Sequence, residues 1–526
     1  MYRTLTNNFT YRLLINLLWF LVIIGLPITS FPLLGQITGA IVAPFSAIPL
    51  AVLLVAWLVP YVIDGGIFPA EKIPLMYFIL IALVISSLAF FLNGYYSQGR
   101  DFFDQSLRAF VTVGIGLSFY LVFSAFPGDE KRIRQTLLFI YIMGALMIPW
   151  TLFEITLLRK YTVVQGFPDW VMRLRTALAI QSPNVTFTNR VSGFAYEPSW
   201  FVRLLNLVLF PIWLSAVYQR KSIFKWRLWV FQAEDFLFLA GLVVFGFSSP
   251  RVGLIAFLAS LAFIGIMLLI RLNRWAVDRI LKRIKRPPKH PGLAKVLLGV
   301  MIVIIMFTLV GGALVGYITA ASSWDSRFKL FVDRYGIIRQ NIFPLTEYRL
   351  LYLGRLLAFF ERVVFWVGGW EIFNDFPLGV GLGNAGFYFF ESMPGAGMES
   401  YEIRNVAFRA NYLANTKNLW TRLLAETGFI GLAVFLVWLY ILWRSAGLIR
   451  HMARPIMKIL GLAGQLFLLA FLIESFSMDS FAMPYQWVMT GLISAGAVLA
   501  RHELAAKAST GEQPVLKDKP EASVQA

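Results

Sequence analysis

The sequence predicts an all-α polytopic integral membrane protein with about 12 transmembrane helices and a long, partly helical outer loop. Hydrophobic residues make up 58% of the chain and charged residues only 14%, and the mean hydropathy is +0.70. This balance lies outside the range that is typical of soluble domains. Apolar runs long enough to cross a bilayer recur along the chain, and basic residues collect in alternate connections between them.

Twelve apolar runs are candidates for membrane helices. The first run is long and begins a series of similar runs, so it predicts a membrane helix and not a cleaved signal peptide. Runs one to five fall in residues 1–157, six to nine in 199–318, and ten to twelve in 417–500. The runs cover 13–34, 39–63, 74–93, 108–126, 137–157, 199–218, 235–249, 252–270, 296–318, 417–443, 459–477 and 482–500, of which the seventh is short.

The connections between the runs predict which side of the membrane each one faces. Residues 271–295 hold nine lysines and arginines against a single acid, Asp278, and such basic connections are typical of the cytoplasmic side. Alternation then places both termini on that side, together with the polar tail 501–526, which is expected to be disordered. Two sizeable loops remain on the outer side, 158–198 and 319–416.

The net charge of +19 follows from this topology. The long outer loop balances nine basic residues with nine acidic ones, so the cytoplasmic connections carry most of the excess, which favours contact with anionic lipid headgroups. A nucleic-acid partner is not expected, because no soluble basic domain is predicted. The chain has no cysteine, and its histidines, His290, His451 and His502, all fall in predicted cytoplasmic segments. These facts exclude disulfides, thiolate metal sites and a histidine-rich metal site on the outer side.

Two segments of the outer loops are amphipathic. In 346–373, Arg349, Arg355 and Arg362 recur at roughly helical spacing among apolar residues, which predicts a helix along the membrane surface or folded back over the membrane core. The segment 167–180 has the same character. The arginines of such helices either contact lipid phosphates or bind a substrate, and the residues alone leave both interpretations open.

The segment 189–205, NRVSGFAYEPSWFVRLL, joins an outer loop to the sixth run. Gly193 permits a bend, and Glu197 with Pro198 begins the helix, since proline suits the first helical turn. One interpretation is structural: Glu197 pairs with Arg190 or interacts with the positive end of the helix dipole. The other is functional: the arginine binds a phosphate and the glutamate accepts a proton from a hydroxyl at the membrane surface.

Two further segments carry groups of interest. FSSPRVGLIAF (247–257) places Arg251 beside two serines and a helix start, which together suit an anionic group; an arginine that only reaches the membrane interface is the alternative. DFPLGVGLGNAGF (375–387) contains three alternate glycines followed by Asn384. It matches neither dinucleotide-binding nor P-loop spacing, so it predicts a tight turn.

Four motifs follow one another along the chain. RVSGFAYEPSW is followed by SSPRVGL before a helix, then by PLGVGLGN within the long outer loop, and then by NLWTRLLAETGFIGLAVFL (418–436) at the next helix. Over about residues 185–436, this order resembles the bacterial O-antigen ligase and polymerase superfamily. The resemblance implies an inner-membrane enzyme that transfers a glycan from polyprenyl (undecaprenyl) pyrophosphate to an acceptor hydroxyl on the periplasmic face. It also implies that neither a metal nor a nucleotide sugar takes part.

Within that superfamily the residues favour a polymerase. O-antigen ligases resemble one another in a histidine of the large outer loop, and 319–416 has none. The Glu-Pro-Ser triplet after Arg-x-x-Gly is more similar to the repeat-unit polymerases of O-antigen, capsule or exopolysaccharide. The implied partners are an undecaprenyl pyrophosphate-linked glycan donor, a glycan or lipid acceptor, the lipid bilayer and a chain-length regulator. Ligation of the glycan to lipid A core or another acceptor is the alternative activity, and no cofactor is expected.

The resemblance and the chemistry together suggest the site residues. The departing pyrophosphate leaves negative charge that preorganised arginines stabilise, and Arg190 and Arg251 are the first candidates. Glu197 is the expected base for the acceptor hydroxyl. Tryptophans can stack on sugars or only anchor the chain in the interface, and Glu399 and Glu402 can also serve as bases. The full set of substrate-binding candidates is Arg404, Arg409, Asn384, Glu399, Glu402, Trp370 and Trp420.

Other classes of protein remain open at this point. A flippase or transporter would use the same helices, but it would place charged residues deep inside them and have a smaller outer loop. Transferases that use polyprenyl monophosphate sugars resemble one another in an acidic residue of the first outer loop, and GQIT at 35–38 has none. A scaffold protein would leave the order of the motifs unexplained.

Overall fold

The structure is a computed structural model that describes residues 8–38, 42–93, 96–97, 99–160, 167–178, 180, 190–224, 226–248, 251–283, 291–323, 326–344, 346–357, 359–410 and 412–509. Within these residues, helices form nearly all the regular structure. The strands form two small antiparallel hairpins, β1 (Tyr96–Ser97) with β2 (Arg100–Asp101) and β3 (Arg227–Leu228) with β4 (Phe231–Gln232). The predicted all-α fold class is therefore confirmed for the described part of the chain.

Helices occur in every predicted run, but the first run, 13–34, is interrupted between Ile24 and Pro32, and the second, 39–63, is helical from Ala47 onward. Those of the N-terminal half are α2 (Phe9–Ile24), α3 (Pro32–Thr38), α4 (Ala47–Leu53), η1 (Leu54–Leu58), α5 (Val59–Ile63), α6 (Lys72–Asn93), α7 (Phe102–Ala125), α8 (Glu130–Lys160), α9 (Asp169–Ala177), α11 (Pro198–Leu204), η2 (Leu205–Leu209), α12 (Phe210–Gln219) and α13 (Ala233–Ser248). Those of the C-terminal half are α14 (Arg251–Arg283), α15 (Pro291–Ala321), α16 (Ser326–Asn341), α17 (Glu347–Leu356), α18 (Phe360–Asp375), α19 (Ala385–Ser392), η3 (Gly395–Glu399), α20 (Tyr401–Phe408), α21 (Leu419–Arg450), α22 (Pro455–Glu474) and α23 (Pro484–Ser509).

Seven helices in the described part of the chain are long enough and apolar enough to cross a membrane. They are α6, α7, α8, the continuous α11–η2–α12, α14, α21 and α22. Each of the other five predicted runs also contains a helix, namely α2, α4–η1–α5, α13, α15 and α23. The structure thus supports a multi-pass membrane protein, while the total of twelve spans stays a prediction.

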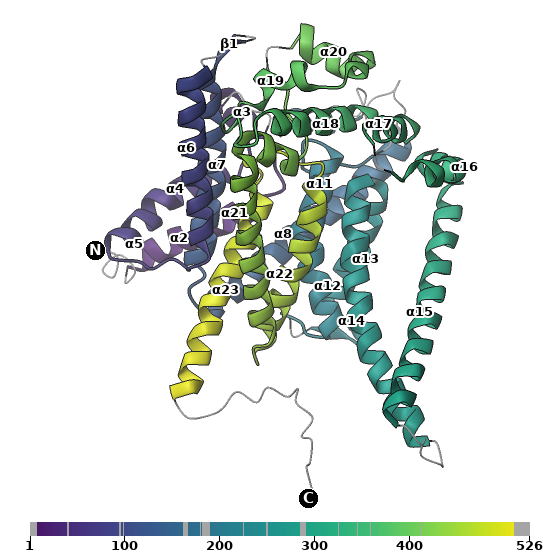
Figure 1. The fold of residues 1–526 in the computed structure, drawn as a ribbon. Helices are drawn as coiled ribbons and strands as arrows, with labels where there is room; N and C mark the ends of the chain where they lie inside the picture. The colour runs from purple at the N-terminus through teal and green to yellow at the C-terminus, as the bar shows by residue number, and fades with distance from the viewer. Residues whose placement is uncertain are drawn as a thin grey trace, which may run out of the picture.

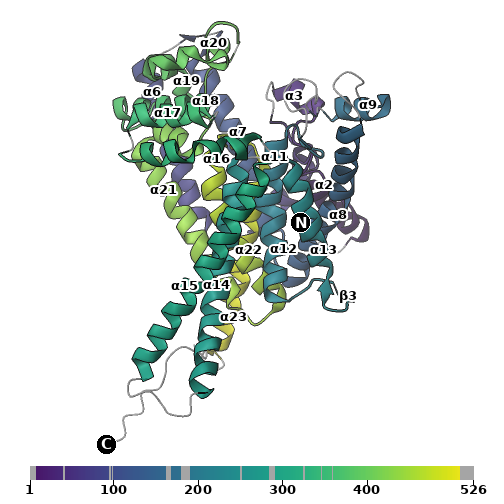
Figure 2. The same cartoon turned by 90° about the vertical axis from the view of Figure 1, so that its right-hand side faces the viewer.

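The long helices lie roughly side by side, and the helices of the long loop gather at one end of them (Figure 1). That end, which carries α16 to α20, is called the loop end, and the opposite end, where α23 finishes, is called the tail end (Figures 1 and 2). The predicted amphipathic segment 346–373 forms two helices, α17 and α18, which lie across the ends of the long helices (Figure 1).

Two predicted connections are shorter than the sequence suggested. Most of the basic segment 271–295 is helical, because α14 continues to Arg283 and α15 begins at Pro291. The predicted tail 501–526 also begins later, because α23 continues to Ser509. Residues 510–526 lie outside the described part of the chain. In both places, helices extend beyond the apolar runs into polar sequence, where lysine, arginine and glutamate are good helix formers.

Large aromatic side chains fill the centre of the bundle. Trp19, Trp213, Trp438 and Trp487 are almost completely buried, and the rings of Trp438 and Trp487 have centroids 5.8 Å apart. Helix α22 packs against α21, α12 and α14, and α23 packs against α7. Lipid tails are as apolar as these side chains, so close van der Waals packing is the main force that holds such helices together in a membrane.

The long loop has a small hydrophobic core of its own. Val364 and Phe365 of α18, Phe389 of α19 and Ile403 of α20 are buried together. Helix α18 packs against α17, α19 and the first part of α21. The loop is therefore a folded helical unit seated on the membrane helices, and it can hold functional side chains in fixed positions.

Two of the membrane runs contain a short π-helical segment. The segment η1 ends two residues before Pro60, and η2 ends two residues before Pro211. A proline within a helix has no N–H to donate and its ring clashes with the preceding turn. The wider π turn accommodates the proline and is frequent at functional sites. The π-helical segment η2 contains Asn206, which contributes to the site described next.

Candidate functional site

Seven charged side chains gather at the loop end of the bundle, and we call them the charged cluster. They come from α11, from α18, from the start of α21 and from the end of α22 with the residues that follow it. The members of the charged cluster are Glu197, Arg203, Arg362, Lys417, Arg422, Glu474 and Asp479.

The bend before α11 brings the first member into place. Glu197 is the N-cap residue of α11 and Pro198 occupies the first turn, as predicted. The bend itself depends on Gly193, whose φ of +58° is a conformation that favours glycine. The Glu197 carboxylate accepts a hydrogen bond from the Ser199 hydroxyl. It also lies within electrostatic range of Arg362 and Lys417.

A buried ion pair holds this bend against α8. The Glu154 carboxylate lies 2.7 Å from Arg175 Nη1 and accepts hydrogen bonds from the backbone N–H groups of Ser192 and Gly193, at 3.2 and 2.8 Å. Both charged side chains are at most 5% exposed. Arg175 belongs to α9, which lies in the same predicted outer loop (158–198) as the bend, so the Glu154 contacts fix two segments of that loop to one membrane helix.

Replacing Glu154 by alanine is expected to destabilise the protein by about 3 kcal/mol, because it leaves the Arg175 guanidinium buried without its charge partner. The measurement is thermal or denaturant unfolding in detergent. The double variant Glu154→Gln with Arg175→Gln removes both charges and is expected to recover part of the loss. Equal stability of Glu154→Ala and the unmodified chain would contradict this structural role.

Arg203 is the most buried cation of the charged cluster. Its side chain is 5% exposed, and its Nε lies 3.7 Å from a Glu474 carboxylate oxygen. Its Nη2 donates to the Ser477 carbonyl, and the Ser477 hydroxyl lies 3.2 Å away. Asn206 Nδ2 donates to Glu474 at 2.7 Å and so orients the carboxylate. The ion pair is therefore held by a π-helical residue that lies one turn beyond Arg203.

Arg362 reaches the same carbonyl from the long loop. Its Nη1 donates to Ser477 O at 3.4 Å, so two guanidinium groups converge on one backbone oxygen. Burial lowers the pKa of Arg362 below its usual value, the nearby charge of Arg203 lowers it further, and the carboxylates of Glu197, Asp479 and Glu474 oppose the shift. Two like charges held together in a sheltered place favour the binding of an anion between them.

Lys417 connects the charged cluster to the helices of the long loop. Its φ of +50° is uncommon for a residue with a side chain. Its ammonium forms an ion pair with Glu402 and lies 4.4 Å from the centroid of the Phe365 ring. Burial lowers the pKa of Lys417 to about 8, with a further contribution from the charge of Arg362.

Arg422 is held by a break in α21. Its Nε lies 3.0 Å from Glu426, and its Nη1 donates to the carbonyl of Asp479. The helix breaks at Gly428, where φ is +62°, and the carbonyls of the preceding turn cannot accept their usual helical bonds. The glycine-rich turn supplies the missing donors, because the N–H groups of Val380 and Gly381 bind the carbonyls of Ala425 and Glu426 at 2.9 and 3.0 Å.

This contact explains why the turn needs glycines. The residues Gly379, Gly381 and Gly383 have φ values of +92°, +90° and +86°, which L side chains rarely adopt. A Cβ atom on Gly379 would also lie 2.6 Å from the backbone nitrogen of Gly428. The predicted tight turn is confirmed, and it acts as a cap for the broken helix that carries Arg422 and Glu426.

The charged cluster has the chemistry for an anion and a hydroxyl. Arg203, Arg422 and Lys417 are paired with Glu474, Glu426 and Glu402. Arg362 and Lys417 also lie within electrostatic range of the carboxylates of Glu197 and Asp479. Asp479 Oδ2 is one of the buried polar atoms of the described residues that have no hydrogen-bond partner. Buried polar atoms are nearly always satisfied, so this oxygen has the capacity to accept a hydrogen bond from a ligand.

Arg190 and Arg251 lie at the junction of α13 and α14. Arg190 Nε donates to the Ser248 carbonyl at 2.8 Å. Arg251 begins α14 as predicted, and its Nη1 donates to the Leu357 carbonyl at 2.6 Å. Two residues after Arg251, the carbonyl of Gly253 accepts from Asn206 at 2.8 Å, so the start of α14 contacts the residue that orients Glu474.

The candidates in and around α20 lie mainly on the exposed surface. Arg404 donates to the carbonyls of Met398 and Glu399 at 2.8 and 3.0 Å, and Arg409 is exposed just after the helix. The Glu399 carboxylate lies 2.6 Å from an arginine of α17. Glu402 alone of this group reaches the charged cluster, through Lys417.

The remaining candidates differ in exposure. Asn384 is fully buried, and its side chain donates to Ser106 at 2.8 Å, so it anchors the glycine-rich turn to α7. The Trp420 indole donates to the Leu472 carbonyl at 3.1 Å and packs between helices. Trp370 is 48% exposed on α18, two turns after Arg362. Of these three, Trp370 has the exposure that contact with a large substrate requires.

Sequence reasoning missed several members of the charged cluster. Arg203, Arg422 and Glu474 each lie inside a predicted apolar run, and Asp479 lies between two of them. A charge inside a membrane run is costly and is therefore a sign of function. That signal was present in the sequence, but it does not say which charges meet. The partners of Arg203 lie more than 250 residues away along the chain.

The binding of an anionic donor is expected to weaken as the pH rises through about 8. Lys417 has a lowered pKa, so its neutral form becomes dominant above that value, and the site loses one positive charge. The groups that face it are Glu402, Arg362, Asp479, Glu197 and Glu361. The measurement is donor affinity between pH 7 and 9, with the Lys417→Arg variant as control because arginine keeps its charge. An identical pH dependence in both proteins would refute the assignment.

The comparisons with known proteins leave the family open. No protein-family model matches the sequence, and no curated protein matches it at a significant level. The resemblance to the O-antigen ligase and polymerase superfamily therefore rests on the order of the motifs, and the function rests on the chemistry of the charged cluster.

Proposed function

We propose that the protein transfers a glycan from a polyprenyl pyrophosphate to an acceptor hydroxyl at the charged cluster, and that it polymerises repeat units of a surface polysaccharide. The observation that carries the proposal is the convergence of Arg203 and Arg362 on the Ser477 carbonyl beside the carboxylates of Glu197 and Asp479. Closely placed guanidinium groups suit a pyrophosphate, and a carboxylate beside them suits the activation of a hydroxyl.

The reaction balances with these groups. The acceptor hydroxyl oxygen attacks the anomeric carbon of the donor glycan, and its proton passes to the carboxylate of Glu197. The bond between that carbon and the pyrophosphate oxygen breaks, and the lipid pyrophosphate leaves with the electron pair. Arg203, Arg362 and Lys417 then stabilise the charge that develops on the leaving group. The carrier lipid already supplies a good leaving group. The residues of the charged cluster therefore need only position the two substrates and stabilise the negative charge of the departing pyrophosphate.

Helix α18 offers a path for the sugars of the donor. Trp366 and Trp370 follow Arg362 at intervals of four residues, so the three side chains occupy one stripe of the helix. The Trp366 ring lies 5.9 Å from Phe476, which belongs to the same segment as Glu474 and Asp479. Aromatic rings beside a phosphate site suit the apolar faces of sugars, and the exposed edge of Trp370 leads away from the charged cluster.

Polymerisation is preferred to ligation because residues 319–416 contain no histidine. Transport is a second candidate, since buried ion pairs inside membrane helices also occur in transporters. The placement of the pairs favours a transferase. Arg203 lies in the first two turns of α11, Arg422 and Glu426 in the first two turns of α21, and Glu474 ends α22. All of these charges lie at the loop end, and none of the four lies midway along its helix.

The decisive experiment incubates the purified protein with a polyprenyl-pyrophosphate repeat unit, with and without lipid A core. Lipid-linked polymer without added core supports the proposed polymerase, whereas glycan attached to the core supports a ligase. The absence of both products, together with movement of the lipid-linked unit across a vesicle membrane, would replace the transferase by a transporter. A chain-length regulator from the same cell can be added to test whether it alters polymer length.

The proposed site requires the loop end to face the periplasm of the bacterial inner membrane. The chain has no cysteine, so single cysteines can be introduced and labelled from outside intact cells. Gly395→Cys lies at the loop end, where an added side chain meets nothing within 4 Å, and it is expected to react. Lys131→Cys, exposed near the start of α8 at the tail end, is expected to react only after the cells are permeabilised. If instead Lys131→Cys reacts in intact cells and Gly395→Cys does not, the loop end faces the cytoplasm and the predicted topology is wrong.

A further inference from the structure

A small hairpin at the tail end exposes an unusual number of apolar side chains. Strands β3 and β4 join through Trp229 and Val230, and β3 lies beside the start of α13 (Figure 2). Trp226, Leu228 and Phe231 are 51–56% exposed, Val230 is 73% exposed, and Trp229 is 94% exposed. Trp229 also has a φ of +56° in a turn position where glycine or asparagine is normal. A bulky residue kept in that conformation indicates a role beyond the turn itself.

The base of the hairpin is firmly held to the bundle. The Gln232 N–H donates to Asp235 at 2.7 Å, and Arg220 lies 3.3 Å from the same carboxylate. The neighbouring Glu234 is fully buried and accepts bonds from the Ser222 hydroxyl and the Ile223 N–H, at 2.8 and 3.1 Å. These contacts fix the connection between α12 and α13 on both sides of the hairpin, so its apolar tip points outward from a rigid base.

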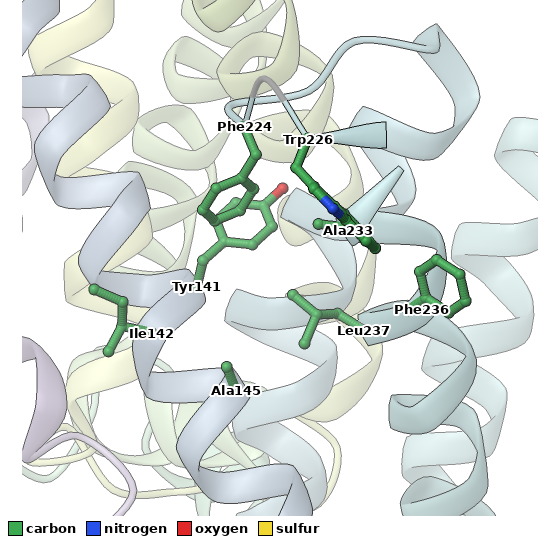
Figure 3. A pocket seen from close by; sticks show the side chains of 8 residues that line it. All are labelled: Tyr141, Ile142, Ala145, Phe224, Trp226, Ala233, Phe236 and Leu237. Carbon is green, nitrogen blue, oxygen red and sulfur yellow. The ribbon is translucent and has the colours of Figure 1, made fainter. Parts of the chain in front are cut away.

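An apolar pocket lies directly beside the hairpin (Figure 3). It has a volume of about 410 Å³, which is within the range of small-molecule sites. Its walls come from α8 on one side and from Trp226 and α13 on the other (Figure 3). The lining is almost entirely apolar, which suits a hydrocarbon chain and offers little to a polar ligand. The lining residues are Tyr141, Ile142, Ala145, Phe224, Trp226, Ala233, Phe236 and Leu237.

Two basic side chains, Arg227 and Arg134, lie next to residues of the pocket wall. The segment 219–232 contains four basic residues and no acid. Arg227 is exposed on β3, and the Arg134 guanidinium donates at 3.2 Å to the carbonyl of Ile223, the residue before Phe224 of the pocket wall. Aromatic residues interleaved with cations are typical of a surface that lies in the interface of a membrane containing anionic lipids.

We propose that the pocket binds one acyl chain of an anionic phospholipid from the leaflet at the tail end, with the hairpin tip inserted among the neighbouring lipids. The phosphate of that lipid binds Arg227 and Arg134, and Trp229 lies at the level of the headgroups. The acyl chain fills the space between α8 and α13, which otherwise exposes Phe236 and Ala145. This lipid site is separate from the charged cluster and does not depend on the proposed transfer reaction.

Lipid retention tests the pocket. The full-length protein is reconstituted with equal amounts of phosphatidylglycerol and phosphatidylcholine, extracted gently, and examined by native mass spectrometry. One phosphatidylglycerol is expected to stay bound. Ala145→Phe fills the pocket and is expected to reduce that population about tenfold, the effect of losing about two buried CH₂ groups. Leu146→Phe is the matched control, because Leu146 is 58% exposed on the same helix and does not line the pocket.

Two further measurements test the recognition of the lipid phosphate and the insertion of the hairpin tip separately. Arg227→Gln with Arg134→Gln is expected to abolish the preference for phosphatidylglycerol over phosphatidylcholine. A dye attached at Trp229→Cys is expected to be quenched by lipids that carry a spin label on the headgroup. Equal retention in the two phenylalanine variants, equal binding of the two lipids by the unmodified chain, or an unquenched dye would each overturn the proposal. All three measurements remain valid if the protein proves to have no transferase activity.

Discussion

Replacing Glu197 by glutamine is expected to lower the rate of polymer formation per folded molecule by about 10²- to 10⁴-fold, the range that general-base assistance typically contributes. Glutamine keeps the shape of the side chain and can still contact Ser199, but it cannot take up the proton of the attacking hydroxyl. The fold is expected to persist, because Glu197 is partly exposed at a helix N-terminus, where loss of a charge costs about 1 kcal/mol or less. The measurements are turnover and thermal stability in detergent.

A matched control is Glu399→Gln, which changes an exposed carboxylate at the same end of the molecule that pairs with an arginine of α17. It is expected to leave turnover nearly unchanged. Near-normal turnover in Glu197→Gln would contradict the role of Glu197 as general base and leave it with a structural role. If Asp479→Asn then proved inactive while remaining folded, the base would be the other carboxylate of the charged cluster.

Replacing Arg362 by methionine is expected to lower turnover by about 10²- to 10³-fold, the effect of removing one preorganised group that stabilises developing negative charge. Arg362→Lys is expected to restore only part of the activity, because an ammonium lacks the planar fork that binds two phosphate oxygens. The measurements are turnover and donor affinity at a saturating concentration of acceptor.

Stability distinguishes this role from a structural one. Burial and the charge of Arg203 lower the pKa of Arg362, so the fold disfavours its charged form. Arg362→Met is therefore expected to retain or gain thermal stability while it loses activity, since a buried cation is removed. A large loss of stability with normal turnover in the remaining folded protein would contradict the proposal. Arg404→Ala, an exposed arginine that binds carbonyls of its own segment, serves as the control.

Local features of the site could be predicted because they depend on nearby residues. Proline after Glu197 predicts the start of α11, and the glycines of 375–387 predict a tight turn, since each limits the backbone locally. The partners could not be predicted in this way. The glycine-rich turn supports α21 through Ala425 and Glu426, and the bend at Gly193 is held by Glu154. Such pairings depend on which helices are neighbours, and hydropathy carries no information on that choice.

The composition and the spacing of apolar runs by themselves determine that this is a multi-pass helical chain, because a bilayer requires long apolar helices whatever their arrangement. The same pattern places a helix in each run but does not give all the helix ends, since α2 stops at Ile24 inside the run 13–34 and α14 continues to Arg283 beyond the run 252–270. Only the tertiary structure decides that Arg203, Arg362 and Lys417 meet beside Glu197 and Asp479. Their convergence follows from packing among α11, α18, α21 and α22, which is set by the shapes of buried side chains and by contacts between residues far apart in the sequence.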